Sequence, residues 1–310
     1  MSNIEFKIIE DPVEAKEIWE IFSEHKVIDD EWDFRNIWTQ ELELPFHFIV
    51  GYEGDKPIGL LALQRNTIVG LGPSLLGMDK PYLEFFGGVD TDDNRVFLLP
   101  GYEDRVEDFL NQIKEPAILT SLRDHVVGNH EAEFYLNRFE VNIEGIKDYK
   151  EYVDKNFEGK TRRNILRELK GKGVRDLSIE VKDGKEEDLE LLFKFSIDRF
   201  GDKSSFHMEQ RRNVYRNLMK KFDVDLFLIL LNGEVKAVVY AIVYKNTYVG
   251  VNTGYDYLVP NLGKLVFTAS LERALKRGCT VYDVGQGSKW KEQLHIPMIP
   301  QYKLSLNLQP

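Results

Sequence analysis

The sequence contains a single cysteine, Cys279. One cysteine cannot build an internal disulfide framework, and it excludes a zinc site made of several cysteines. The string His130-Glu131-Ala132-Glu133-Phe134 resembles the first half of a zinc-protease helix, but the second histidine of that motif is missing. We therefore expect no metal site.

Long hydrophobic runs are also missing. The longest, Leu226–Leu231 and Ala237–Tyr244, have the length of strands and are bounded by polar residues, so neither is long enough to span a membrane. No basic segment followed by an apolar stretch opens the sequence, as it would in a secretory signal. An apolar content of 43% suits substantial hydrophobic cores. We expect a cytoplasmic globular protein.

Acidic residues outnumber basic ones, 52 to 41, but the imbalance is confined to the first half. Residues 1–150 carry 31 acidic and 14 basic side chains, whereas residues 151–310 carry 21 and 27. Halves of opposite sign indicate two domains, with an anionic ligand mainly on the second. Attraction between the halves is an alternative explanation. We expect domains at 1–145 and 146–310.

The two halves repeat one order of elements: a helix, a hairpin, an apolar strand, and then a helix and a strand. Gly54-Asp55 and Asn232-Gly233 mark the two hairpin turns. The repeat indicates a structural duplication. The expected elements of the first half are strands 4–9, 46–52, 56–64, 67–71 and 117–122 and helices 11–25 and 101–113. Those of the second half are strands 177–182, 224–231, 235–244, 246–254 and 280–284 and helices 159–173, 186–200, 208–222 and 264–277.

The stretch Gly254–Lys291 is the most informative part of the chain. A strand ends in the loop Pro260-Asn261-Leu262-Gly263, and a helix begins at about Lys264. The first N–H groups of a helix lack internal partners and favour an anion, so Leu262–Leu265 is a candidate phosphate cradle. The pattern is not a Walker loop. An ordinary strand–helix crossover with a solvated lysine is the alternative.

These residues also carry a resemblance to a known family. The basic run Lys160–Arg167, the hairpin Leu231–Tyr240, the segment Gly254–Leu265 and the string Tyr282–Gly287 followed by Trp290-Lys291 are similar to segments of tandem GNAT-fold N-acyltransferases, the relatives of Fem aminoacyltransferases and CelD-like proteins. Val284 and Trp290 depart from the aromatic residue and the tyrosine that are usual in the family's Asp-Phe-Gly-x-Gly…Tyr-Lys signature.

The resemblance implies an α/β (α+β) fold of two GNAT-like domains, each a mixed, mostly antiparallel sheet flanked by helices, with the first domain degenerate. It implies transfer of an acyl or aminoacyl group to an amine, such as that of a cell-envelope precursor. The donor would be acyl-CoA or aminoacyl-tRNA, used as a substrate and not as a permanently bound cofactor. Both donors are polyanions, which agrees with the basic second half. A tRNA partner stays open, and no DNA partner is expected.

Acyl transfer to an amine needs donors for the tetrahedral oxyanion, a deprotonated amine and a protonated leaving group. Backbone N–H groups from Asn252 to Gly254 are our candidate oxyanion donors. Tyr255 and Tyr257 are candidate phenols, and Asp283 is placed to accept a proton or to orient Lys291. The alternatives are that Asp283 only caps the turn at Gly285 and that Lys291 is a surface lysine.

Further candidates come from the basic segment and a helix junction. Arg162, Arg163 and Arg167, with Lys160 and Lys170, are dense enough to bind phosphate, although a solvated helix face explains them as well.

His207 is a candidate substrate-binding base, although a lone histidine is more often structural. Two other functions stay open: a non-catalytic tRNA- or nucleotide-binding protein, motivated by the same basic segment, and a degenerate acyltransferase that serves as a scaffold.

Overall fold

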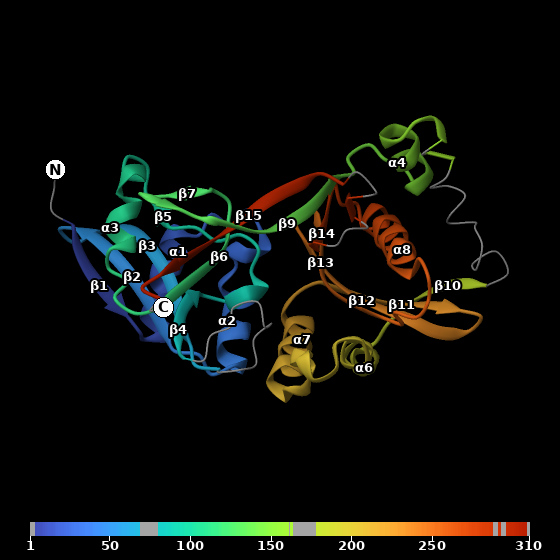
Figure 1. Cartoon of the computed structure of the whole chain (residues 1–310), viewed down its shortest axis with the longest axis horizontal. Helices are drawn as coiled ribbons and strands as arrows, with labels where there is room; N and C mark the ends of the chain where they lie inside the picture. Colours follow the sequence, from blue (N-terminus) through green and yellow to red (C-terminus); the bar gives the residue numbers. More distant parts are fainter. Residues whose placement is uncertain are drawn as a thin grey trace. The chain divides into compact units, whose positions relative to one another are not determined.

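The computed structural model describes residues 4–68, 80–160, 162–163, 178–287, 291–292 and 296–308. The chain forms two compact units (Figure 1). Unit 1 comprises Met1–Asn137 and Pro300–Pro310, and unit 2 comprises Arg138–Ile299. The C-terminal residues therefore belong to the first unit, although the sequence analysis assigned them to the second domain. No helix in the described ranges is long and apolar enough to cross a membrane.

Unit 1 is a mixed sheet whose strands follow the order β1-β2-β3-β4-β6-β15, with β5 paired to β3. The main-sheet strands are β1 (Glu5–Ile9), β2 (Phe46–Glu53), β3 (Lys56–Asn66), β4 (Tyr82–Phe85), β5 (Phe97–Leu98), β6 (Ala117–Leu122) and β15 (Met298–Leu306). A separate small hairpin joins β7 (Val126–Val127) and β8 (His130–Glu131), and the helices are α1 (Pro12–Phe22), α2 (Trp32–Glu41) and α3 (Val106–Leu110).

The first helix forms as its sequence predicts. Asp11 accepts hydrogen bonds from the first N–H groups of α1, and Pro12 occupies the first helical position. The helix packs Trp19 against the aromatic side chains of the sheet, where Trp32 stacks on Phe46 with ring centroids 5.6 Å apart. These aromatic side chains are thus part of the hydrophobic core.

Unit 2 has a sheet of the order β9-β14-β13-β12-β11-β10. The strands are β9 (Glu133–Asn142), β10 (Ile179–Asp183), β11 (Val224–Leu231), β12 (Glu234–Tyr244), β13 (Thr247–Tyr255) and β14 (Val281–Gln286). The helices are α4 (Tyr149–Asn156), α6 (Leu189–Phe200), α7 (Glu209–Lys221) and α8 (Leu262–Lys276). Figure 1 shows α8 on one face of β11–β13 and the pair α6 and α7 on the other.

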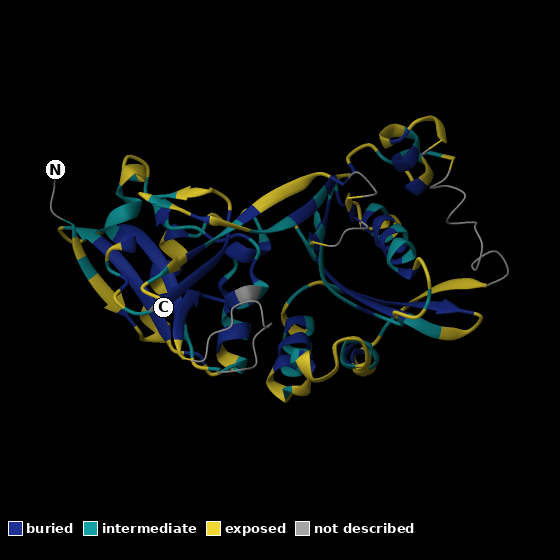
Figure 2. Ribbon diagram, viewed as in Figure 1, coloured by how far each residue is buried: buried dark blue, intermediate teal, exposed yellow. Residues whose placement is uncertain are grey.

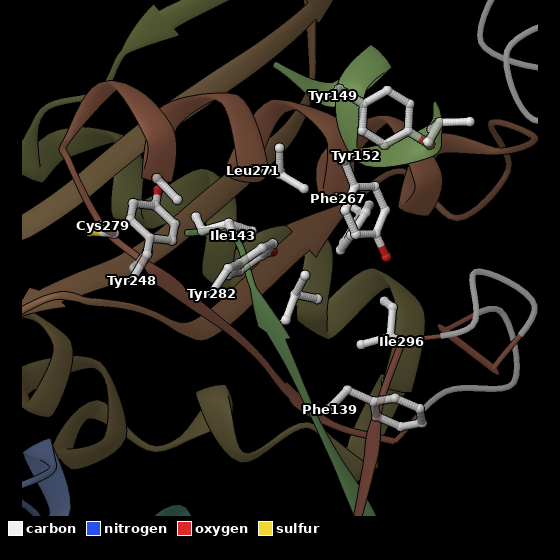
Figure 3. Packing of buried hydrophobic residues seen from close by; sticks show 14 of the residues in the cluster. Phe139, Ile143, Tyr149, Tyr152, Tyr248, Phe267, Leu271, Cys279, Tyr282 and Ile296 are labelled. Carbon is white, nitrogen blue, oxygen red and sulfur yellow. The ribbon is translucent and has the colours of Figure 1, made fainter. Parts of the chain in front are cut away.

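Burial follows from this layering. The central strands of each unit are buried, whereas the outer faces of the helices are exposed (Figure 2). Under α8, the Phe267 ring stacks on Tyr282, and Tyr248 and Tyr152 pack beside them (Figure 3). The last turns of α8 are tied to the sheet because Arg273 pairs with the buried carboxylate of Asp225.

The predicted elements compare well with the observed ones where the pattern is local. Both hairpins are present, as β2–β3 and β11–β12. The strand expected at 67–71 is wrong at Thr67 and Ile68, which are not in a strand, and its remaining residues lie outside the described ranges. The strand that follows the β2–β3 hairpin and pairs with β3 is β4 instead. Of the expected helix 159–173, most also lies outside those ranges.

Candidate active site

The two parallel strands of unit 2 separate part-way along their length. Thr247, Tyr248 and Val249 of β13 pair with Val281, Tyr282 and Asp283 of β14, and the pairing stops there. Beyond this point, among the described residues, β13 pairs only with β12, as far as Tyr255, while β14 continues against β9. We call the place where β13 and β14 part the β13–β14 split.

Two glycines allow the close packing at the apex of the split. A Cβ atom on Gly285 would lie 3.1 Å from the carbonyl oxygen of Gly250, and a Cβ atom on Gly250 would lie 3.2 Å from the carbonyl oxygen of Asp283. Gly285 also has a φ of 75°, a conformation that strains residues with a side chain. The two strands can therefore approach closely and then diverge.

Beyond the split, one edge of β13 has no partner strand in the part of the chain that the structure describes. The N–H of Asp256 donates to the carbonyl of Lys236 on β12. Because backbone groups alternate along a strand, those of Gly254 and Asn252 also point toward β12, whereas those of Thr253 and Tyr255 point to the free edge.

This alternation corrects one detail of the sequence prediction. Asn252 and Gly254, proposed as oxyanion donors, have their N–H groups in the ladder with β12, so only Thr253 of that range faces the free edge. Its N–H donates a hydrogen bond to the Oδ1 atom of Asn252 at 2.7 Å. Gly254 has a packing role, since a Cβ atom there would lie 2.6 Å from the carbonyl oxygen of Leu192 on α6.

The helix α8 begins next to this edge. Asn261 precedes it in a left-handed conformation, with φ of 62°, and no side chain caps the helix. The Asn261 carbonyl accepts hydrogen bonds from the N–H groups of Lys264 and Leu265. The first turn carries no acidic residue, and Lys264 stands in it. The predicted phosphate cradle is therefore a helix start that favours an anion.

Leu262 and Leu265 take part in this helix start only through their backbones. The Leu262 side chain is buried in the core formed with β11 and β12, and Leu265 packs against the same core. The N–H groups of Leu262 and Gly263 begin the helix. They are the groups that a bound phosphate would meet.

Asp283 lies within β14 and Lys291 follows that strand, but the two side chains do not pair with each other. The Asp283 carboxylate is buried, pairs with Arg138 of β9 at 2.5 Å, and accepts the N–H of Gly285 at 2.9 Å. It therefore orients Arg138 and the turn, not Lys291.

Lys291 is buried as well, and its Nζ atom donates to the carbonyl oxygens of Val284, Gly285 and Gln286, at 2.8, 3.2 and 2.5 Å. Three donors on three carbonyls fix the end of β14 where it leaves β13. The sequence analysis had no signal for Arg138, which lies 145 residues from Asp283.

The two candidate tyrosines differ in setting. Tyr255 is half-buried against the core under α8, whereas Tyr257 is 53% exposed in the loop that follows β13. On the opposite face of β13, the Nδ2 atom of Asn252 donates to the Tyr215 hydroxyl at 2.7 Å, and Tyr240 donates to the Tyr215 carbonyl. Tyr215 is a residue near the split that the sequence analysis missed.

The predicted basic residues have local partners. Arg162 donates to Asp154 at 2.6 Å, and this hydrogen bond raises the pKa of the arginine. Arg163 is exposed and donates to the carbonyl of Gly159 at 3.3 Å, and His207 is exposed with its Nε2 atom 3.1 Å from the carbonyl of Gly201.

Arg167 lies outside the described residues. The structure thus brings none of these residues into contact with Asp283, Lys291 or the start of α8 in the contacts that it describes.

Unit 1 contains a related parallel pair whose surroundings differ. β4 and β6 are parallel at Leu83 and Ala117, and the segment Phe86–Asn94 then runs beside β6, where Asn94 bridges to Leu122. The buried guanidinium of Arg35 holds this segment through bonds to two of its carbonyls and to the Asn94 side chain. The chain itself thus occupies the edge of β6 in unit 1.

Comparison with known proteins agrees with this topology. Residues 159–303 match the family model described as acetyltransferase (GNAT) domain. The structure of FemX has a TM-score of 0.55 at 10% identity, and the match covers 98% of each chain. L-PGS from Bacillus licheniformis has a TM-score of 0.55 at 13% identity, with 97% of this chain and 93% of that chain covered.

A tandem GNAT protein from the clavulanic acid biosynthesis pathway has a TM-score of 0.54 at 9% identity, with 99% and 100% covered. Among curated protein sequences, none matches this chain. At these identities the solved structures bear on the fold alone. The predicted fold class is confirmed, and residues 159–303 are similar to a GNAT acetyltransferase domain.

Proposed function

We propose that the protein transfers an acyl group from acyl-CoA to an amine. The observation that carries this proposal is the juxtaposition of the β13–β14 split with the start of α8. The free edge belongs to β13, and the first turn of α8 contains no acidic residue. Only the loop 256–261 separates the two elements in the sequence. An extended, amide-containing donor that ends in phosphates matches both features.

The donor phosphates would lie at the N–H groups of Leu262 and Gly263, with Lys264 adding positive charge. The amide groups of the donor arm would hydrogen-bond to the backbone of Thr253 and Tyr255, as a further strand would. This arrangement directs the thioester toward the apex of the split at Gly250.

The reaction then requires few side chains. The neutral amine nitrogen attacks the thioester carbon, a C–N bond forms, and the negative charge moves to the carbonyl oxygen, where N–H donors at the apex of the split would stabilise it. The C–S bond breaks, the amine loses a proton, and the thiolate takes one up. Tyr255 and Tyr257 are the candidate proton donors to sulfur, and Asp283 and Lys291 are positioning residues that hold β14 apart from β13.

A calorimetric titration of the full chain tests the donor. We expect binding of acetyl-CoA or a longer acyl-CoA and, for Lys264→Gln, a dissociation constant about tenfold higher, since one charge-assisted contact contributes about 1.5 kcal/mol. Lys276→Gln removes an exposed lysine from the last turn of the same helix, and it should bind as the wild type does.

Two outcomes would overturn the proposal. Binding of tRNA without any acyl-CoA binding, with affinity falling steeply as salt rises, would favour an aminoacyl-tRNA donor or a non-catalytic RNA-binding protein. No heat with any donor would favour a scaffold.

A further inference from the structure

Arg199 lies at the end of α6, and its side chain is held by two aromatic rings. Its guanidinium carbon is 4.9 Å from the centroid of the Phe200 ring and 5.1 Å from that of Tyr255. The residue is exposed. Stacking on rings fixes a guanidinium by its faces and leaves its N–H groups, which lie at its edge, able to bind another group.

This guanidinium lies beside the last residue of β13. The α6 helix packs on the face of the sheet to which Gly254 points, because a Cβ atom on Gly254 would meet the Leu192 backbone. Tyr255 points to the other face, where it packs against the core under α8. Since β12 covers the opposite edge of β13 up to Tyr255, the Arg199 side chain reaches Tyr255 at the free edge.

The setting of Arg199 differs from that of other arginines in unit 2. Six of them pair with a carboxylate in the described part of the chain: Arg138, Arg162, Arg212, Arg216, Arg273 and Arg277. Within the same residues Arg199 has no carboxylate partner. Phe200 is exposed beside it, and Tyr257 and Leu258, in the loop that follows Tyr255, are exposed as well.

We propose that Arg199 binds an anionic group of the acceptor, so that the acceptor is an amine that also carries a carboxylate or a phosphate. The proposal rests on the proposed acyltransferase function. The start of α8 already provides for the donor phosphates, whereas Arg199 comes from the opposite face of the sheet. Its planar N–H edge matches the two oxygens of a carboxylate or phosphate.

Matched amines that differ in one acidic group test this inference. The pairs are cadaverine and lysine, ethanolamine and phosphoethanolamine, and glucosamine and glucosamine 6-phosphate. Binding is measured by calorimetry on the full chain with CoA present, so that no turnover occurs. We expect the wild type to bind the anionic member of at least one pair about tenfold more tightly, as one charge-assisted contact allows.

The variants assign the preference to one side chain. Arg199→Gln should lose the preference for the anionic amine. Arg199→Lys should keep part of this preference, because lysine retains the positive charge but lacks the planar set of N–H donors of a guanidinium. Lys194→Gln removes an exposed positive charge from the same helix and should keep the preference in full.

Three results would overturn the proposal. They are a wild type that prefers no anionic amine, an Arg199→Gln variant that keeps the preference, and an Arg199→Gln variant that loses only CoA binding, which would assign Arg199 to the donor.

Failure of the wild type to bind acetyl-CoA would refute the proposed acyltransferase function instead. In that case, a preference for anionic amines that disappears in Arg199→Gln would still support Arg199 as an anion-binding residue.

Discussion

Replacing Asp283 by alanine distinguishes a structural role for this carboxylate from a catalytic one. The Asp283 side chain is 1% exposed and that of Arg138 is 9% exposed, with 2.5 Å between the paired atoms. Removing one member of a buried ion pair leaves the other charge without its partner, which costs about 3–5 kcal/mol. We therefore expect Asp283→Ala to lose activity because unit 2 is destabilised.

The size of this effect suits urea unfolding followed by circular dichroism. With a denaturant slope of about 2 kcal/mol/M, a loss of about 4 kcal/mol lowers the midpoint of the unit 2 transition by about 2 M. The double variant Arg138→Met/Asp283→Ala should be less destabilised than the two single variants together, by about 0.5–3 kcal/mol. Asp223→Ala breaks an exposed pair with Arg277 and should cost about 1 kcal/mol or less.

The structural reasoning is wrong if Asp283→Ala unfolds at the wild-type midpoint. If such a stable variant also binds acetyl-CoA normally but does not turn it over, Asp283 takes part in proton transfer. The double variant separates the two roles further, because restored stability would restore activity only where Asp283 has no chemical part.

Two further predictions concern the supports of the sheet. Gly254→Ala should destabilise unit 2 by about 1–3 kcal/mol, measured by thermal unfolding, because the new Cβ atom meets the Leu192 backbone at 2.6 Å; an unchanged melting temperature would show that α6 can move away freely. Burial raises the pKa of Asp225, but its hydrogen bonds to Arg273 and Tyr248 outweigh this and hold the pKa below its ordinary value of 3.8. The stability that Asp225 contributes is therefore present above pH 3.8 and is lost as the pH falls through the lower folded-state pKa; Asp225→Asn should flatten the acid side of a melting-temperature profile, and an identical profile would contradict this.

Local patterns were enough to predict much of unit 2. The turn Asn232-Gly233 has positive φ at both residues, as a tight hairpin requires, and it lies between the strands that the apolar runs indicated. The helix after the loop at Pro260 begins at Leu262, two positions from the predicted start, because Asn261 takes the left-handed conformation that ends the loop. Such features depend on neighbours in the sequence.

Partners that come from distant segments were not predictable in this way. No turn motif beside β9 or β15 indicates which strand each of them pairs with. β15 pairs with β6 of unit 1. Arg138 on β9 meets Asp283 across 145 residues. The string Tyr282–Gly287 identified the right segment, but the residue that neutralises its aspartate was visible only in the fold.

A bulge at Val251 decides which backbone groups face the free edge of β13. Gly250 lies opposite Ala241 and Asn252 lies opposite Tyr240, so that Val251 is an extra residue in β13. An inserted residue of this kind shifts the alternation of backbone groups by one position for the rest of the strand. In a regular strand, with Val251 opposite Tyr240, the N–H groups of Asn252 and Gly254 would face the free edge. With the bulge, those of Thr253 and Tyr255 do, and the Tyr255 side chain turns to the α8 face, where Arg199 reaches it. The bulge thus decides which backbone groups a donor would meet and places an arginine beside them.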